Sequence, residues 1–153
     1  MKAVIQRVIN ASVTVDGRIT GKIESGILVY LGVAVNDSET DATWLSDKII
    51  NLRIFNDNNG IMNMSLTDIQ KNDPNAAILV ISQFTLLADS RKGRRPSWNL
   101  AAPPEKAKKL YEYFIEKIKN SGIKCESGKF QASMKVNYTN DGPVTIILDT
   151  AEL

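Results

Sequence analysis

The stretch Asn140-Asp141-Gly142-Pro143-Val144-Thr145-Ile146-Ile147-Leu148 joins a turn directly to an apolar run, and it constrains the fold more than any other segment. Pro143 has no backbone N–H and a fixed φ, so it does not fit the middle of a central strand. Gly142 tolerates φ values that other residues avoid. We therefore expect a rigid loop tip at the entrance of a strand, with uncovered main-chain carbonyls and no bulky side chain beside them.

Outward from this stretch, short β-type runs alternate with two helical segments. Strands are expected over residues 2–9, 26–35, 76–83, 123–126, 129–138 and 144–149, and a hairpin over 12–23. One helix should follow the capping signal Ser38-Glu39-Thr40-Asp41. A second should run from Pro103-Pro104 to Gly122, with an apolar face of Leu110, Tyr113, Phe114 and Ile118. This order predicts one domain over residues 1–153 of the α/β class (α+β), a largely antiparallel sheet or barrel-like β core with two main outer helices.

The composition is that of an ordinary globular domain, with 43% hydrophobic and 24% charged residues among 153. No apolar run approaches the length of a membrane span, and no leader-like segment opens the chain. We therefore expect a cytoplasmic protein without a membrane partner. The single cysteine, Cys125, excludes an intramolecular disulfide and lies in a pattern typical of a half-buried structural thiol.

The absence of histidine restricts the chemistry more than any other feature of the composition. It removes Ser-His and Cys-His pairs and the usual zinc ligand sets, and no other metal-ligating cluster stands out, so we expect no metal and no cofactor. A hydrolase with this composition must use a carboxylate, a lysine, water or the substrate itself as its base. The net charge of +2 argues against broad coating of a nucleic acid but permits a small basic patch at one end of a tRNA.

Three segments are candidates for function, and each also has a purely structural interpretation. Ser82-Gln83-Phe84-Thr85 ends a buried strand, where free backbone N–H groups can hold an oxyanion or where Ser and Thr can bond to local backbone. A nucleophilic Thr85 is not favoured, because nothing places a base beside it. The run Arg91-Lys92-Gly93-Arg94-Arg95 is either a solvated loop or a phosphate-binding loop. Trp98 either stacks on a base or anchors that loop.

Five segments in register, spread over essentially the whole chain, resemble the D-aminoacyl-tRNA deacylase family. They are Met1-Lys2-Ala3-Val4-Ile5-Gln6-Arg7-Val8, Leu52-Arg53-Ile54-Phe55, Ser82-Gln83-Phe84-Thr85-Leu86, Lys92-Gly93-Arg94-Arg95-Pro96-Ser97-Trp98 and the stretch at 140–145. The resemblance implies hydrolysis of the ester of D-aminoacyl-tRNA, and of glycyl-tRNA, as chiral proofreading in translation. It also implies the acceptor end of aminoacyl-tRNA as partner, and a homodimer with composite active sites.

The resemblance assigns roles to individual residues as well. It implies that the terminal adenosine and the scissile ester lie in a catalytic pocket lined by Ser82, Gln83, Phe84 and Thr85. It implies a cis Gly142-Pro143 bond at a tip that enters the active site of the other subunit, where main-chain oxygens meet the substrate's amino group and leave no room for an L side chain. Further residues implied in substrate binding are Arg7, which holds the tip, Asn140, which shapes it, and Met134, near the pocket. Beside such a pocket, the expected tRNA contacts are Lys92, Arg94 and Arg95.

The chain departs from the family at one place near that pocket. Many members have Phe-Gly-Ala before the methionine, whereas this chain has Phe130-Gln131-Ala132, so a side chain is added and the pocket volume changes. Two other functions stay open on the sequence: a non-catalytic module that binds the tRNA acceptor end, and a purely structural β-rich dimer. Turnover of the ester separates the enzyme from both.

Overall fold

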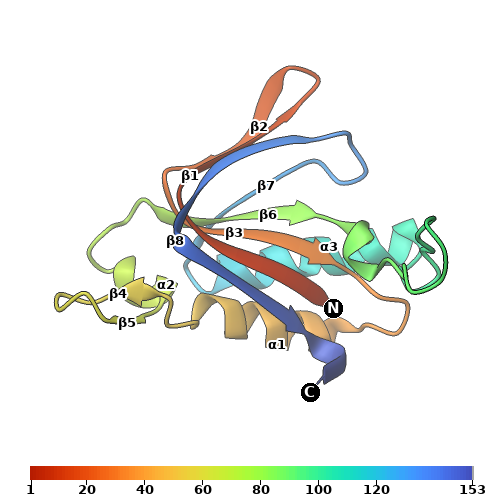
Figure 1. Cartoon of the computed structure of the whole chain (residues 1–153). Coiled ribbons are helices and arrows are strands. Elements are labelled where there is room, and N and C mark those ends of the chain that lie inside the picture. Colours follow the sequence, from red (N-terminus) through yellow and green to blue (C-terminus); the bar gives the residue numbers. More distant parts are fainter. Residues whose placement is uncertain (153) are drawn as a thin grey trace.

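The fold is built on one six-stranded sheet that curls around a concave face (Figure 1). The computed structural model describes residues 1–152. Neighbouring strands follow the order β2-β1-β3-β6-β7, and β8 pairs with the other side of β1. The bounds are β1 Lys2–Val15, β2 Arg18–Ile23, β3 Ser25–Gly32, β6 Ala76–Ser82, β7 Lys124–Ser127 and β8 Lys135–Asp149.

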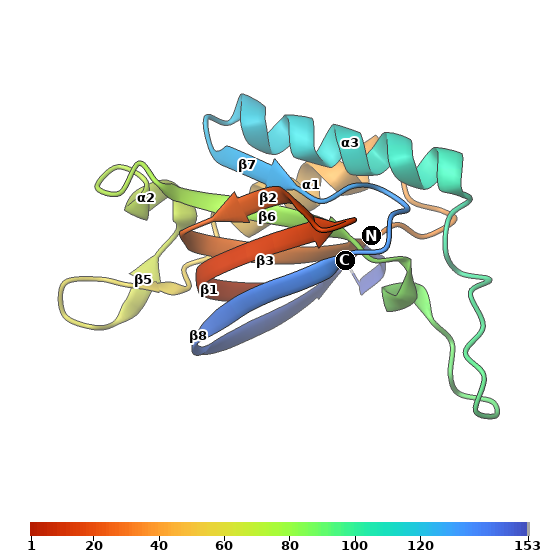
Figure 2. The ribbon, with the colours of Figure 1, turned by 90° about the horizontal axis from the view of Figure 1, so that it is seen from above.

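Two long helices, α1 (Glu39–Ile50) and α3 (Pro104–Asn120), cover one face of the sheet, and Figure 2 shows α3 beside β7, at the edge opposite β8. Helix α1 begins at the predicted capping box, where the N–H of Ser38 donates to Asp41 Oδ2 at 2.8 Å. Helix α3 ends before Gly122, whose φ of +85° suits a helix stop. The shorter elements are β4 (Phe55–Asn56), β5 (Met62–Met64), α2 (Leu66–Ile69), and the 3-10 turns η1 (Phe84–Leu87) and η2 (Thr150–Glu152).

Apolar side chains fill both faces of the central strands. Ile5, Val80 and Phe114 belong to the cluster between the sheet and the helices, and Leu28 and Leu79 belong to the cluster on the concave face. Strands β3 and β6 are therefore buried on both sides, which explains why their sequences are continuous apolar runs rather than alternating ones. The carboxyl ends of these two parallel strands carry the candidate site.

The predicted fold class is confirmed: an α+β arrangement with two main outer helices and mostly antiparallel pairing. The sheet is nevertheless mixed, because β3 pairs with β6 and β6 with β7 in parallel. No helix within residues 1–152 is long and apolar enough to cross a membrane.

Two details of the sequence prediction are wrong. The strands expected at 129–138 and 144–149 form one strand, β8, and residues 129–134 precede it as a turn and loop. Strand β8 lies at the sheet edge, where Pro143 is accommodated by a register shift opposite the segment Gln6 to Val8 of β1. On α3, Tyr111 is buried and the predicted Tyr113 is only half-buried.

Candidate active site

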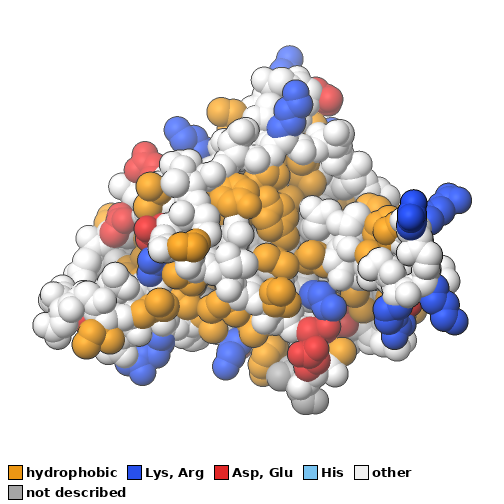
Figure 3. Space-filling model, in the orientation of Figure 1, with side chains coloured by type: hydrophobic (Ala, Val, Ile, Leu, Met, Phe, Trp, Pro, Cys, Tyr) orange, Lys and Arg blue, Asp and Glu red, His pale blue; other side chains and the backbone are white. Residues whose placement is uncertain are grey.

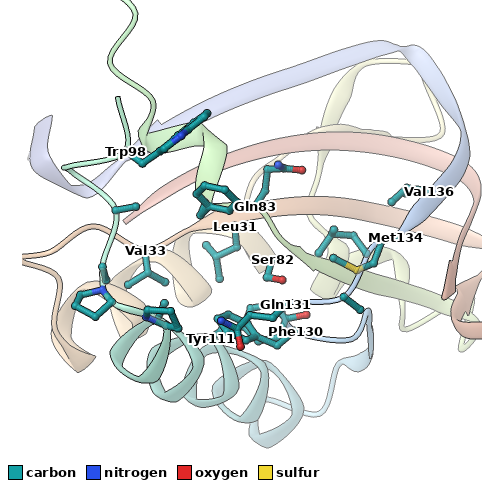
Figure 4. Close-up of a pocket in the computed structure, with 18 residues that line it drawn as sticks. Leu31, Val33, Ser82, Gln83, Trp98, Tyr111, Phe130, Gln131, Met134 and Val136 are labelled. Atoms are coloured by element: carbon teal, nitrogen blue, oxygen red, sulfur yellow. The ribbon is translucent and has the colours of Figure 1, made fainter. Parts of the chain in front are cut away.

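A pocket of about 770 Å³ opens at the carboxyl ends of β3 and β6, between η1 and the start of α3 (Figure 4). Its walls come from segments far apart in the sequence, including Leu31, Ile81, Ala107 and Phe130. Crevices at the carboxyl ends of neighbouring parallel strands are common ligand sites, because backbone groups there are free of the ladder. The position of this pocket follows from the parallel pairing of β3 with β6.

The segment Ser82-Gln83-Phe84-Thr85 lies at the edge of this pocket. Ser82, Gln83 and Phe84 line it, whereas Thr85 is exposed next to them. The N–H of Gln83 donates to the carbonyl of Leu31 at 2.8 Å, which fixes the exit from β6. The first residues of a 3-10 turn leave their N–H groups without intrahelical acceptors, and within residues 1–152 nothing accepts from the N–H of Phe84 or Thr85.

The hydroxyl of Thr85 has a donor, not a base, as its neighbour. Nε2 of Gln83 donates a hydrogen bond to Thr85 Oγ1. An attacking hydroxyl needs a partner that accepts its proton, and an amide NH₂ group does not do this. The local geometry therefore suits Thr85 to orienting or donating, rather than to attacking an ester.

The rest of the pocket is largely apolar. Tyr111 is its one ionisable lining side chain within the described residues; burial raises its pKa, and its hydroxyl donates to the carbonyl of Val80 at 2.8 Å. Met134, predicted from the sequence, lines the pocket, and Gln131 lines it with a φ of +61°. No group of three or more His, Cys, Asp or Glu side chains that could hold a metal ion occurs in the described part of the chain.

The Gly142-Pro143 tip lies elsewhere. The peptide bond is cis, both residues are exposed, and neither of them lines the pocket within the described chain. The side-chain amide of Asn140 closes the neck of the tip, because Nδ2 donates to the carbonyls of Arg7 at 3.0 Å and Val144 at 3.1 Å. The tip is therefore a small, pinned projection from the edge strand.

Arg7 supports the tip from beneath. It is a buried arginine whose Nη1 donates to the carbonyl of Ile54 at 2.6 Å, and whose Nε lies 2.8 Å from Oδ2 of Asp141. A Cβ added to Gly142 would lie 2.9 Å from Nη2 of Arg7. The predicted contact between Arg7 and the tip is thus present, although both lie away from the pocket of their own chain.

The basic run lies on the loop that follows η1. Asp89 and Ser97 exchange two backbone hydrogen bonds of 2.9 and 2.8 Å, and these bonds close the base of the loop. Arg91 pairs with Asp89 at 2.7 Å and lowers the pKa of that carboxyl to about 2. Exposed cations beyond this pair are Lys92, Arg94 and Arg95. Figure 3 shows basic side chains gathered at this side of the molecule, beside a hollow lined with apolar side chains.

Several pocket residues were not found by sequence reasoning. Tyr111 and Phe130, which pack with ring centroids 5.7 Å apart, come from α3 and from the turn before β8. Their only sequence signal was an apolar helix face and an aromatic residue in a supposed strand. Neither pattern tells which strand ends these side chains will meet.

Comparisons with known proteins agree over nearly the whole chain. The family model described as D-Tyr-tRNA(Tyr) deacylase matches residues 4–149. A D-aminoacyl-tRNA deacylase of Thermosipho melanesiensis is 60% identical over 154 residues, covering 100% of this chain and 99% of the relative. One from Koribacter versatilis is 55% identical, covering 98% of this chain and 97% of the relative.

Two solved structures share the fold. One, named c-Myc DNA Unwinding Element Binding Protein, is 41% identical with a TM-score of 0.89, covering 98% of this chain and 99% of that one. The other, described as a "probable eukaryotic D-amino acid tRNA deacylase", is 15% identical with a TM-score of 0.81, over 96% and 97% of the two chains. The second shows likeness of fold alone.

Proposed function

The chain belongs to the D-Tyr-tRNA(Tyr) deacylase family, whose members are hydrolases of aminoacyl-tRNA, and from this premise we propose how it cleaves and selects its substrate. It hydrolyses the ester of D-aminoacyl-tRNA, releasing the D-amino acid and free tRNA, as chiral proofreading in the cytoplasm. The observation that carries the proposal is the apolar pocket edged by Ser82, Gln83 and Phe84 beside an exposed basic loop. This pairing suits an uncharged nucleoside joined to a phosphate backbone.

Cleavage proceeds without a covalent enzyme intermediate. The terminal nucleoside occupies the pocket, and the ester carbonyl lies against the uncommitted N–H groups at the start of η1, which stabilise the oxyanion as water attacks. Thr85 already accepts a hydrogen bond from Gln83 and lacks a base, so it does not attack. The neighbouring ribose hydroxyl orients the water, and the protein supplies position and main-chain donors.

A second copy of the chain supplies the chiral filter. The Gly142-Pro143 tip is exposed, pinned by Arg7, and outside its own pocket, so a two-fold symmetric dimer gives it a pocket to enter. Exposed apolar side chains on the adjacent strands, Ile9 at 57% and Ile147 at 66%, support such an interface. Main-chain carbonyls at the tip accept from the substrate's ammonium and form a wall against an L side chain.

Glycyl-tRNA is a second substrate under this proposal, because glycine presents no side chain to the wall. The filter recognises the amino group and the direction of the side chain rather than its identity. Many D-amino acids are therefore accepted, whereas L-amino acids are excluded.

The test follows ester loss from matched D-, L- and glycyl-tRNA, with and without the protein. We expect the D and glycyl esters to disappear faster with protein, while the L ester keeps its spontaneous lifetime. Protection of all three esters would instead show a binding module without catalysis, and equal acceleration of D and L esters would remove the chiral filter.

A further inference from the structure

Two large aromatic side chains form an exposed step at the rim of the pocket. Phe84 and Trp98 both line the pocket, and their ring centroids are 5.2 Å apart at an interplanar angle of 65°. Phe84 is 56% exposed and Trp98 is 42% exposed. Figure 4 shows Trp98 at the end of the pocket nearest the basic loop. Apolar surface of this size beside a binding pocket indicates a contact with a partner.

Anchoring the loop does not account for this exposure. The base of the loop is closed by the two backbone hydrogen bonds between Asp89 and Ser97, and the carbonyl of Trp98 accepts from the N–H of Ala101 at 3.0 Å. Backbone contacts therefore hold Trp98 in place. A large part of the indole is left to face outward.

The cations next to this step have no competing partners. Lys92, Arg94 and Arg95 form no ion pair within residues 1–152, whereas Lys108 and Lys109 of α3 pair with Glu112 and Glu39. Single-stranded nucleic acid is bound by this combination, with bases stacked on aromatic rings and phosphates held by nearby cations. The step and the loop thus point to one ligand chemistry.

We propose that the Phe84–Trp98 step stacks the unpaired bases that immediately precede the terminal nucleotide of the tRNA, while Lys92, Arg94 and Arg95 hold the phosphates of that stretch. This inference rests on the proposed function, because it takes the terminal nucleotide and its ester to fill the pocket. Stacking requires only the π face of a base, so every acceptor end is held alike. The step positions the ester without reading the amino acid.

The first test compares two substrates that share the same ester. One is D-tyrosyl-tRNA, and the other is D-tyrosyl-adenosine, which lacks all preceding nucleotides. Trp98→Ala should lower kcat/KM for the tRNA about 10-fold, the effect of losing one stacked base, and leave the adenosine ester within about 2-fold. Trp98→Phe should restore most of the loss. Leu100→Ala is the matched control, because Leu100 is 55% exposed in the same loop but does not line the pocket.

The second test reads stacking without catalysis. Trp44→Phe leaves Trp98 as the only tryptophan, because the chain has two. Its fluorescence should be quenched by the cytidine-cytidine-adenosine trinucleotide of the tRNA 3′ end and hardly by adenosine alone. Equal loss on both esters, no loss on either, or equal quenching by both ligands would overturn the proposal. Failure of wild type to cleave any D ester would overturn the proposed function instead, and the quenching result would still decide the stacking.

Discussion

The hydroxyl of Thr85 receives a hydrogen bond from Nε2 of Gln83, and this contact limits what Thr85 contributes to ester hydrolysis. Thr85→Ala should lower kcat by less than about 10-fold, whereas removing a true nucleophile costs on the order of 10⁶-fold. Single-turnover hydrolysis of a D-aminoacyl-tRNA measures the difference, with Thr85→Ser as the control that keeps the hydroxyl. An acyl group trapped on Thr85 would show that this assignment is wrong.

Gln131 combines a left-handed backbone with a place in the pocket wall. Gln131→Gly should leave the free energy of unfolding unchanged or raise it by up to about 1 kcal/mol, because relief of backbone strain is partly offset by the freer unfolded chain. It should also change the ratio of kcat/KM for D-tyrosyl- and D-alanyl-tRNA, because the pocket widens. Asp16→Gly is the matched control: Asp16 has a φ of 49° in the β1–β2 turn, far from the pocket. An unchanged substrate ratio in Gln131→Gly would contradict this role.

At the scale of elements, the basic loop between η1 and α3 should act on tRNA affinity alone. Arg94→Ala with Arg95→Ala should weaken tRNA binding and reduce the slope of log K against log salt by about 1 to 2, because each lost phosphate contact removes about 0.7 to 0.9. The D-to-L ratio should not change. Arg18→Ala with Lys22→Ala removes the same charge from the exposed β1–β2 hairpin and is the control. A salt slope that stays at the wild-type value would place Arg94 and Arg95 in plain solvent.

Local patterns were enough to predict most elements. The capping box at Ser38, the hairpin turn at Asp16-Gly17 and the stop at Gly122 each depend on a few adjacent residues, and all three are present. The continuity of β8 was missed, because a proline in a strand is tolerated only at an edge and the sequence does not say which strand is an edge. The outward tip and the buried Arg7 were expected only through the family resemblance.

The pocket was predictable only in part, for the same reason. Ser82, Gln83 and Met134 fell within recognised motifs, and all three line it. Tyr111 and Phe130 reach it because α3 crosses beside β7 and the turn before β8 folds back, and these are long-range consequences of parallel pairing. A one-dimensional pattern does not record which helix face meets which strand end.

The whole molecule should lose stability at alkaline pH. Burial raises the pKa of Cys125 from 9.0 to about 12 and that of Tyr30 from 10.0 to about 12. Both groups ionise more easily in the unfolded chain, so their stabilising contribution is complete below pH 9 and is lost as the pH rises toward 12. Urea midpoints should therefore fall between pH values of about 8 and about 11, and less steeply in Cys125→Ala. A midpoint that is constant over this interval would contradict the burial of these groups.

The central claim is that each active site combines a pocket from one subunit with the Gly142-Pro143 tip of the other. The most direct measurement mixes two inactive variants. Ala132→Trp fills the pocket and leaves the tip intact, whereas Gly142→Ala spoils the tip by bringing a Cβ against Arg7 and leaves the pocket intact.

Subunits of the two variants are unfolded, mixed in equal amounts and refolded, and mixed dimers are verified by native mass spectrometry. We predict that D-aminoacyl-tRNA hydrolysis returns to about a quarter of the wild-type rate, because half of the dimers are mixed and one of the two sites in each is intact. Mixed dimers that hydrolyse no faster than the two separate variants would contradict the composite site.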